Sequence, residues 1–130
     1  ANRFVAEFIG SPAMNMVDAQ RGDDGLSAHG GSLEMTDAQA AAVRGHAKAE
    51  LTFGMRPENL TFANTGLPGT LTMIEPTGPE TYATVDTAVG LLTARVPGLL
   101  AAHVGDRVHL QWNPADAHLF DRADGQRLPV

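Results

Sequence analysis

The amino-acid sequence predicts one mainly β domain, either a small barrel or a sandwich, with one or two short helices. The chain has 130 residues, enough for one compact core and too few for two ordinary domains. Its 14 glycines and 8 prolines divide it into short apolar runs, which favours many strands over a few long helices. The predicted strands recur about every 10 residues, as in small barrels and sandwiches.

Two short helices are predicted, one near each end of the first third of the chain. Residues 2–9 have apolar side chains at helical spacing, and Gly10 should end that helix. Thr36 and Gln39 have the spacing of a capping box at the start of a second helix over residues 38–43. We expect Gly45 to end it.

The clearest predicted strand covers residues 51–56, where the sequence L-T-F-G-M-R alternates apolar and other side chains. This period of two is typical of a strand with one buried face. Pro57 should end the strand, because proline cannot donate a ladder hydrogen bond. Arg56 and Glu58 would point the same way in an extended chain, which predicts an exposed ion pair at the strand exit.

Further strands are predicted at residues 14–17, 70–75, 82–85, 91–96 and 108–112. Leu71 and Met73 should share a buried face, because side chains two residues apart in a strand point the same way. After the turn at Thr77-Gly78-Pro79, the 82–85 run should return as the antiparallel partner. Trp112 is expected to pack in the core, with a stacking platform as the alternative.

Turns are predicted wherever glycine follows a short polar residue or proline. Asp23-Asp24-Gly25 and Asp124-Gly125 predict hairpin turns. The paired aspartates lack the closing glutamate of an EF-hand, so a turn is favoured over calcium binding. Asn64-Thr65-Gly66 and Pro68-Gly69 predict further turns.

The composition excludes several functional classes. The net charge is −6, and the nine basic residues are scattered, so neither nucleic acid nor an anionic membrane surface is an expected partner. The absence of cysteine removes disulfides, thiolate nucleophiles and zinc–thiolate sites. No stretch approaches the roughly 20 apolar residues of a membrane span, and the first residues lack a signal-peptide core.

Motifs for catalysis are also missing. Lys48 has no adjacent glycine, so the chain contains no phosphate-binding loop of the Gly-Lys-hydroxyl type. There is no G-x-S-x-G, and the five histidines do not have the spacing of a metal site. Asp116, His118 and Asp121 come nearest to a relay, but no nucleophile lies close to them in sequence. The chain is therefore not predicted to be an enzyme.

Four motifs appear in order along the chain: F-I-G-S-P-A-M-N at 8–15, G-M-R-P-E at 54–58, I-E-P-T-G-P-E-T at 74–81 and H-L-F-D at 118–121. Together they resemble the C-terminal regulatory region, with its TOBE-type segment, of ATP-binding subunits of carbohydrate ABC importers. The maltose and glycerol-3-phosphate importers are the best-known types. Met55 stands where the family often has isoleucine, and residues 17–49 match less closely.

The resemblance implies an OB-like β-barrel of the TOBE/MOP type that forms a single regulatory domain over residues 1–130. This domain would belong to a longer ATPase subunit, with residues 1–12 at the end of its linker helix. ATP and Mg²⁺ would bind the ATPase domain, and no cofactor is expected in this chain. The implied partners are a second copy of the subunit, the permease subunits and a regulatory protein. The implied location is the cytoplasmic face of the plasma membrane, without insertion. The alternative is a module that binds a small oxyanion such as molybdate.

The same resemblance marks a set of structural or regulatory residues. They are Gly10, Ser11, Pro12, Met14, Asn15, Gly54, Arg56, Pro57, Glu58, Glu75, Gly78, His118, Phe120 and Asp121. We expect residues 8–15 to lie near the hinge to the ATPase domain. The corner formed by Arg56 and Glu58 should help to build a regulatory interface. None of these residues is expected to be catalytic.

Overall fold

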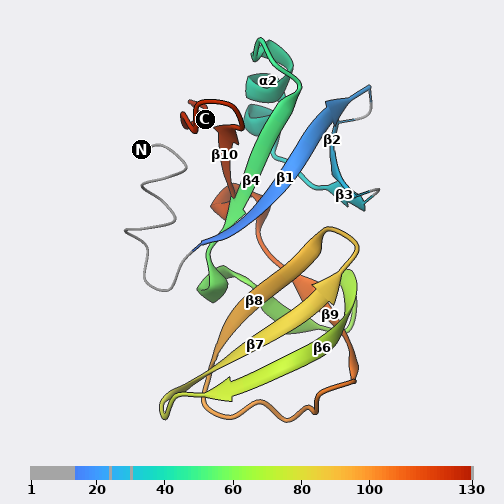
Figure 1. Cartoon of the computed structure of the whole chain (residues 1–130), viewed down its shortest axis with the longest axis vertical. Coiled ribbons are helices and arrows are strands. Elements are labelled where there is room, and N and C mark those ends of the chain that lie inside the picture. Colours follow the sequence, from blue (N-terminus) through green and yellow to red (C-terminus); the bar gives the residue numbers. More distant parts are fainter. Residues whose placement is uncertain (1–13, 24, 30, 130) are drawn as a thin grey trace.

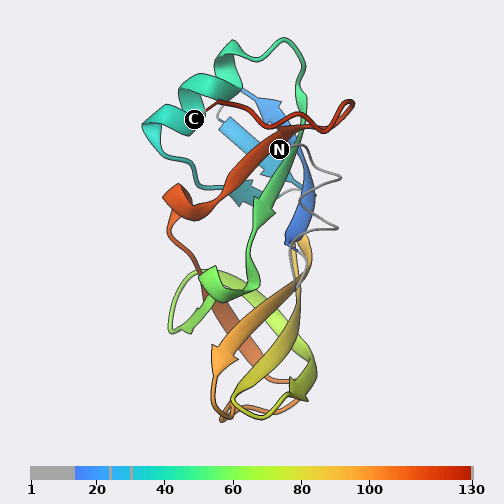
Figure 2. The ribbon, with the colours of Figure 1, turned by 90° about the vertical axis from the view of Figure 1, so that its left-hand side faces the viewer.

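The structure, a computed structural model, describes residues 14–23, 25–29 and 31–129. Within this part, the chain forms two antiparallel sheets of five strands each. The sheets lie one above the other along the long axis, in an upper and a lower lobe (Figures 1 and 2). The predicted helix at residues 2–9, the proposed linker and Gly10, Ser11 and Pro12 lie outside the described residues.

The upper lobe contains the first sheet and the helix. Its strand order is β10 (His118–Asp121), β4 (Glu50–Met55), β1 (Asn15–Gly22), β2 (Gly25–Ala28) and β3 (Gly31–Leu33). Helix α2 (Asp37–Gly45) packs at one end of this sheet (Figure 2). The lobe therefore combines strands from both ends of the described chain.

The lower lobe contains the second sheet. Its strand order is β5 (Thr61–Ala63), β9 (Arg107–Gln111), β6 (Leu67–Pro76), β7 (Glu80–Thr87) and β8 (Gly90–Pro97). Two short 3-10 helices, η1 (Pro57–Asn59) and η2 (Pro114–Asp116), follow β4 and β9 where the chain passes between the lobes. One cluster of buried apolar side chains extends through both lobes.

The prediction of a mainly β chain is confirmed. The two sheets remain open, because within the described residues neither sheet pairs its first strand with its last. Three of the four edge strands are only three or four residues long. Short edges leave few backbone N–H and C=O groups without a partner strand.

Both predicted Asp-Gly turns are found. β1 and β2 pair up to Gly22 and Gly25, and Gly25 has a φ of +126° that only glycine adopts easily. At the end of the chain, the Gly125 N–H donates to the Asp121 carbonyl at 2.8 Å, and Phe120 forms a bridge with Arg127. Asp24 itself lies outside the described residues.

The capping box of α2 is also confirmed. The Thr36 hydroxyl accepts the Gln39 N–H at 3.1 Å, and the Gln39 side-chain oxygen accepts the Thr36 N–H at 2.8 Å. Gln39 is buried, and its amide nitrogen donates to the carbonyls of Pro114 at 2.6 Å and Ala117 at 3.3 Å. The capping residue thus also attaches the helix to the segment that leads into β10.

Two predictions for the lower lobe are wrong. Pro68 and Gly69 do not form a turn but belong to β6, where Pro68 pairs with His109 of β9. A side chain at Gly69 would lie 2.5 Å from the Val85 methyl, so this glycine marks a close approach of strands. Met73 is 53% exposed although Leu71 is fully buried, because the register shifts between these residues and reverses the face.

No helix among the described residues is long and apolar enough to span a bilayer.

Candidate functional site

The structure brings residues of three sequence motifs together at the junction between the lobes. β1 begins at Asn15, β4 leaves the upper sheet at Met55, and β10 enters it at His118 (Figure 2). The fourth motif lies elsewhere. Glu75 and Gly78 are at the β6–β7 hairpin, at the far end of the lower lobe (Figure 1).

Asn15 connects the two sheets directly. Its amide nitrogen donates to the Met55 carbonyl at 3.1 Å and to the Thr93 carbonyl at 2.9 Å. Its amide oxygen accepts the Thr93 N–H at 2.8 Å. One side chain from β1 therefore satisfies backbone groups of β4 above and β8 below, which ties the lobes together.

Gly54 allows three side chains to pack closely beside this connection. A Cβ at residue 54 would lie 2.5 Å from the Met14 sulfur and 3.2 Å from both the Met16 sulfur and Phe120 Cε2. Phe120 and Met14 are both buried. The four residues thus form an apolar packing group on β1, β4 and β10, which gives Met14, Gly54 and Phe120 a structural role.

The corner after β4 differs from the prediction of an ion pair. Pro57 begins η1 and is buried, while Arg56 and Glu58 are exposed on either side of it. The 3-10 turn removes the extended geometry that would place the two side chains together, and no salt bridge joins Arg56 to Glu58. Both charges are instead available at the surface of the junction.

His118 lies between several charges at this junction. Burial lowers the pKa of His118 from its usual 6.5, and the nearby Arg127 and Arg56 lower it further, while Asp116 opposes them. The Arg127 guanidinium also donates to His118 Nδ1. His118 is therefore neutral at pH 7 and accepts rather than donates at Nδ1.

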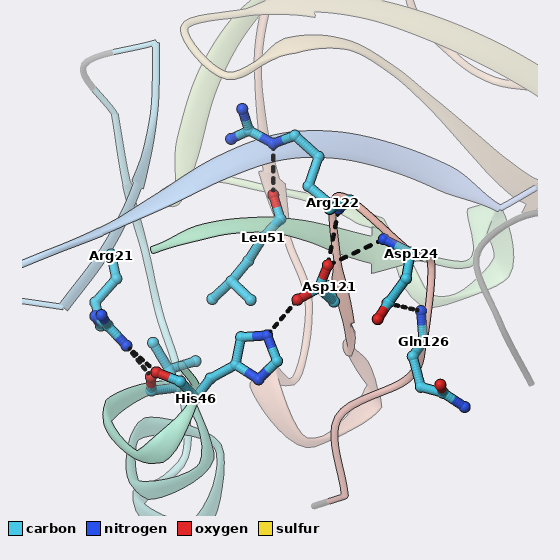
Figure 3. Close-up of polar contacts among 9 residues, drawn as sticks. Arg21, His46, Leu51, Asp121, Arg122, Asp124 and Gln126 are labelled. Carbon is cyan, nitrogen blue, oxygen red and sulfur yellow. Dashed lines mark hydrogen bonds and ion pairs between the residues drawn. The ribbon is translucent and has the colours of Figure 1, made fainter. Parts of the chain in front are cut away.

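Asp121 pairs with a histidine that the sequence does not indicate. Its Oδ2 accepts a hydrogen bond from His46 Nε2 at 2.5 Å, and its Oδ1 accepts the N–H groups of Ala123 and Asp124 at 2.8 and 3.1 Å (Figure 3). The His46 hydrogen bond is the main reason that the pKa of Asp121 falls from 3.8 to about 2. Asp116, His118 and Asp121, which come nearest to a relay in the sequence, do not form one, because Asp121 bonds to His46.

Two arginines hold the elements around this pair. Arg21 donates to the carbonyls of Val43 at 2.9 Å and His46 at 2.7 Å, at the C-terminal end of α2 (Figure 3). Arg122 donates to the carbonyls of Leu51 and Ala19. Since the carboxylate of Asp121 is already fully engaged with the protein, the geometry indicates a structural clamp between α2 and β10.

We expect His46→Ala to lower the stability of the fold above about pH 4 and to make that stability depend less on acid pH. Because the folded-state pKa of Asp121 is depressed, its stabilisation is complete above about pH 4 and is lost as the pH falls from 3.8 towards 2. In the variant, the pKa of Asp121 should rise towards 3.8. The free energy of unfolding should then fall less steeply as the pH is lowered from 3.8 to 2. Carboxyl NMR titration and melting temperatures from pH 2 to 7 measure both effects.

His103→Ala is the matched control, since His103 is exposed and its side chain has no hydrogen bond among the described residues. It should leave the Asp121 titration unchanged. An unaltered Asp121 pKa in His46→Ala would contradict the assigned role of His46.

The described residues do not provide a metal centre. Among residues 14–23, 25–29 and 31–129, no three histidine, aspartate or glutamate side chains gather in a way that could hold a metal ion. The site residues that the structure does bring together bind backbone groups or pack against each other. Among them, Asn15 joins the two lobes, while Asp121 holds α2 against β10 within the upper lobe.

Comparison with known proteins identifies the family. A family model described as a TOBE domain matches residues 53–120, and one described as the MalK OB fold domain matches residues 10–60. The sn-glycerol-3-phosphate import ATP-binding proteins UgpC of Cereibacter sphaeroides and Salmonella typhi are 37% and 35% identical to the chain. The ABC transporter ATP-binding protein y4oS of Sinorhizobium fredii is 33% identical.

These alignments cover 98% of the chain but only 34–36% of each relative, so the chain spans about a third of the length of the curated relatives it matches. The TOBE model alone covers more than half of the chain, from the second half of β4 to β10. The second model adds β1 and its neighbours. The chain therefore belongs to the TOBE domain family.

Proposed function

We propose that the chain is the non-catalytic TOBE domain of the ATP-binding subunit of an ABC importer for a sugar or glycerol phosphate. The observation that carries this proposal is the near-complete match of the chain to one third of ATP-binding proteins named for sn-glycerol-3-phosphate import. In this proposal, ATP and Mg²⁺ bind the remaining part of the subunit. Residues 1–12 form the end of the linker to it.

The proposed role of the domain is to pair two copies of the subunit and to transmit regulation. A second interface raises the effective concentration of the two ATPase halves for each other. A regulatory protein that prefers one arrangement of the pair would shift the transport cycle by its differential affinity. The permease subunits would contact the ATPase parts, which places the domain on the cytoplasmic side of the membrane.

Two surface features support a contact role. Arg56 and Glu58 present opposite charges beside the rigid turn at Pro57. Among residues 14–23, 25–29 and 31–129, the exposed large apolar side chains lie in the lower lobe or its loops: Met73, Leu91, Leu99 and Val104. Contact with another chain would remove such side chains from water. We therefore place the regulatory contact near the corner and the pairing contact in the lower lobe.

Arg56→Ala in the full-length subunit is the experiment that tests the regulatory corner. Transport, or its inhibition by a regulatory protein, should change several-fold. The free energy of unfolding of the 130-residue chain should change by less than about 0.5 kcal/mol, because Arg56 is exposed and has no salt bridge with another described residue. Transport assays in membrane vesicles and urea denaturation measure the two effects.

Arg44→Ala is the charge-matched control, because Arg44 is exposed on α2, away from the junction. It should leave transport and its inhibition unchanged. If Arg56→Ala affects transport only through unfolding of the domain, or not at all, the corner has no regulatory role.

A further inference from the structure

A groove of about 580 Å³ lies between the two lobes. Ser32 and Glu34, at the end of β3, line it from the upper lobe, and Thr65, Gln111 and Trp112 line it from the lower lobe. Its volume is in the range of sites for small molecules. We propose that this groove binds a small, uncharged polyhydroxylated compound, such as a monosaccharide or polyol. The inference does not depend on the pairing of two subunits.

The lower wall of the groove is held in a fixed conformation. The Gln111 amide nitrogen donates to the Thr65 carbonyl at 2.9 Å and to the Thr65 hydroxyl at 3.0 Å. This orientation leaves the Gln111 amide oxygen as a hydrogen-bond acceptor. Gly66 allows the approach, since its φ is +128° and a Cβ there would lie 2.4 Å from the Leu110 carbonyl oxygen. Because these side chains are already fixed, little conformational entropy is lost from the wall when a ligand binds.

Trp112 contributes an apolar surface to the same wall. The residue is half-buried against the core, but its Nε1–H is shielded from solvent and has no hydrogen-bond partner among the described residues. The part of the indole that remains accessible is therefore carbon. Such a surface suits the C–H face of a sugar ring, while the hydroxyl groups of the sugar need polar partners nearby.

The polar partners favour a neutral ligand over an anion. Glu34 is the only charged residue that lines the groove in the described part of the chain, and it is exposed. A neighbouring hollow of about 450 Å³, which shares Gln111 and Trp112, adds Glu58 and Asp116, and the described residues that line it include no lysine or arginine. Phosphate, molybdate and sugar phosphates would be repelled. The groove offers hydrogen-bond acceptors to several hydroxyl groups of a ligand: the Glu34 carboxylate, the Ser32 hydroxyl and the Gln111 amide oxygen.

Trp112 is the only tryptophan of the chain, so its fluorescence reports directly on the groove. We expect a panel of glucose, mannose, ribose and glycerol to include at least one compound that changes its emission saturably below about 50 mM. Glucose 6-phosphate and molybdate should bind at least tenfold more weakly than that compound, because the carboxylates at the groove repel anions. N-acetyltryptophanamide, titrated in parallel, should show no saturation.

Glu34→Gln should weaken binding of the neutral compound about five- to tenfold, because a charged acceptor becomes a neutral one. Glu50→Gln is the matched control: Glu50 is exposed in the same lobe but does not line the groove, so affinity should stay the same. The proposal is overturned if no neutral compound saturates, if an anion binds equally well, or if both variants behave alike.

Discussion

Gly66→Ala is expected to destabilise the chain by about 3 kcal/mol or more. The residue has a φ of +128°, and its new Cβ would lie 2.4 Å from the Leu110 carbonyl oxygen and 2.8 Å from Gln111 Cγ. The nearest atom belongs to the backbone of β9, which its ladder to β6 holds in place. To accommodate the new Cβ, the backbone of β9 has to move against its hydrogen bonds to β6. Urea denaturation measures the loss of unfolding free energy.

Gly78→Ala separates this steric clash from backbone strain alone. Gly78 has a similar φ of +102°, but a Cβ there would meet no atom within 4 Å. Its cost should stay near 1 kcal/mol, the penalty for a left-handed alanine. Equal losses in the two variants would mean that the close approach at Gly66 does not matter.

Asn15→Ala is expected to cost about 2–3 kcal/mol, because it leaves up to three buried or half-buried backbone groups without their partner. These groups are the Met55 carbonyl and both the N–H and the carbonyl of Thr93. The loss should appear in urea denaturation. Faster hydrogen exchange at Thr93 should accompany it, since that N–H belongs to the lower lobe and donates to a residue of the upper one.

Asn64→Ala is the control for Asn15→Ala, because Asn64 is exposed in the β5–β6 turn. Its effect should remain within about 0.5 kcal/mol. If Asn15→Ala is equally mild and Thr93 exchange is unchanged, the two lobes are held together by apolar packing without help from this side chain.

Local features of the fold are predictable from the sequence because their causes lie within a few residues. The strand predicted at 51–56 is found at Glu50–Met55, and Pro57 ends it because it lacks an N–H. The prediction of a single buried face is wrong, since Leu51 to Met55 are all buried between the neighbouring strands and the core. The capping box and the Asp-Gly turns likewise depend on short-range hydrogen bonds. The face of Met73 is not predictable in this way, since a register shift against β7 determines it.

Contacts between distant segments are the part of the site that the sequence does not reveal. His46 and Asp121 are 75 residues apart, and Asn15 and Thr93 are 78 residues apart. No spacing rule connects such residues, because the strand order of the sheets brings them together. The family resemblance marks Asn15 and Asp121, but only their partners show that one joins the lobes and the other fixes α2 to β10.

The most direct test of the proposed function is the self-association of the full-length subunit without nucleotide. Sedimentation equilibrium should show a dimer for the intact subunit and at least tenfold weaker association after removal of residues 14–129, because the second interface is then missing. The ATPase part of the truncated subunit should remain folded by circular dichroism. A folded, truncated subunit that dimerises as tightly as the intact one would contradict the pairing role of this domain.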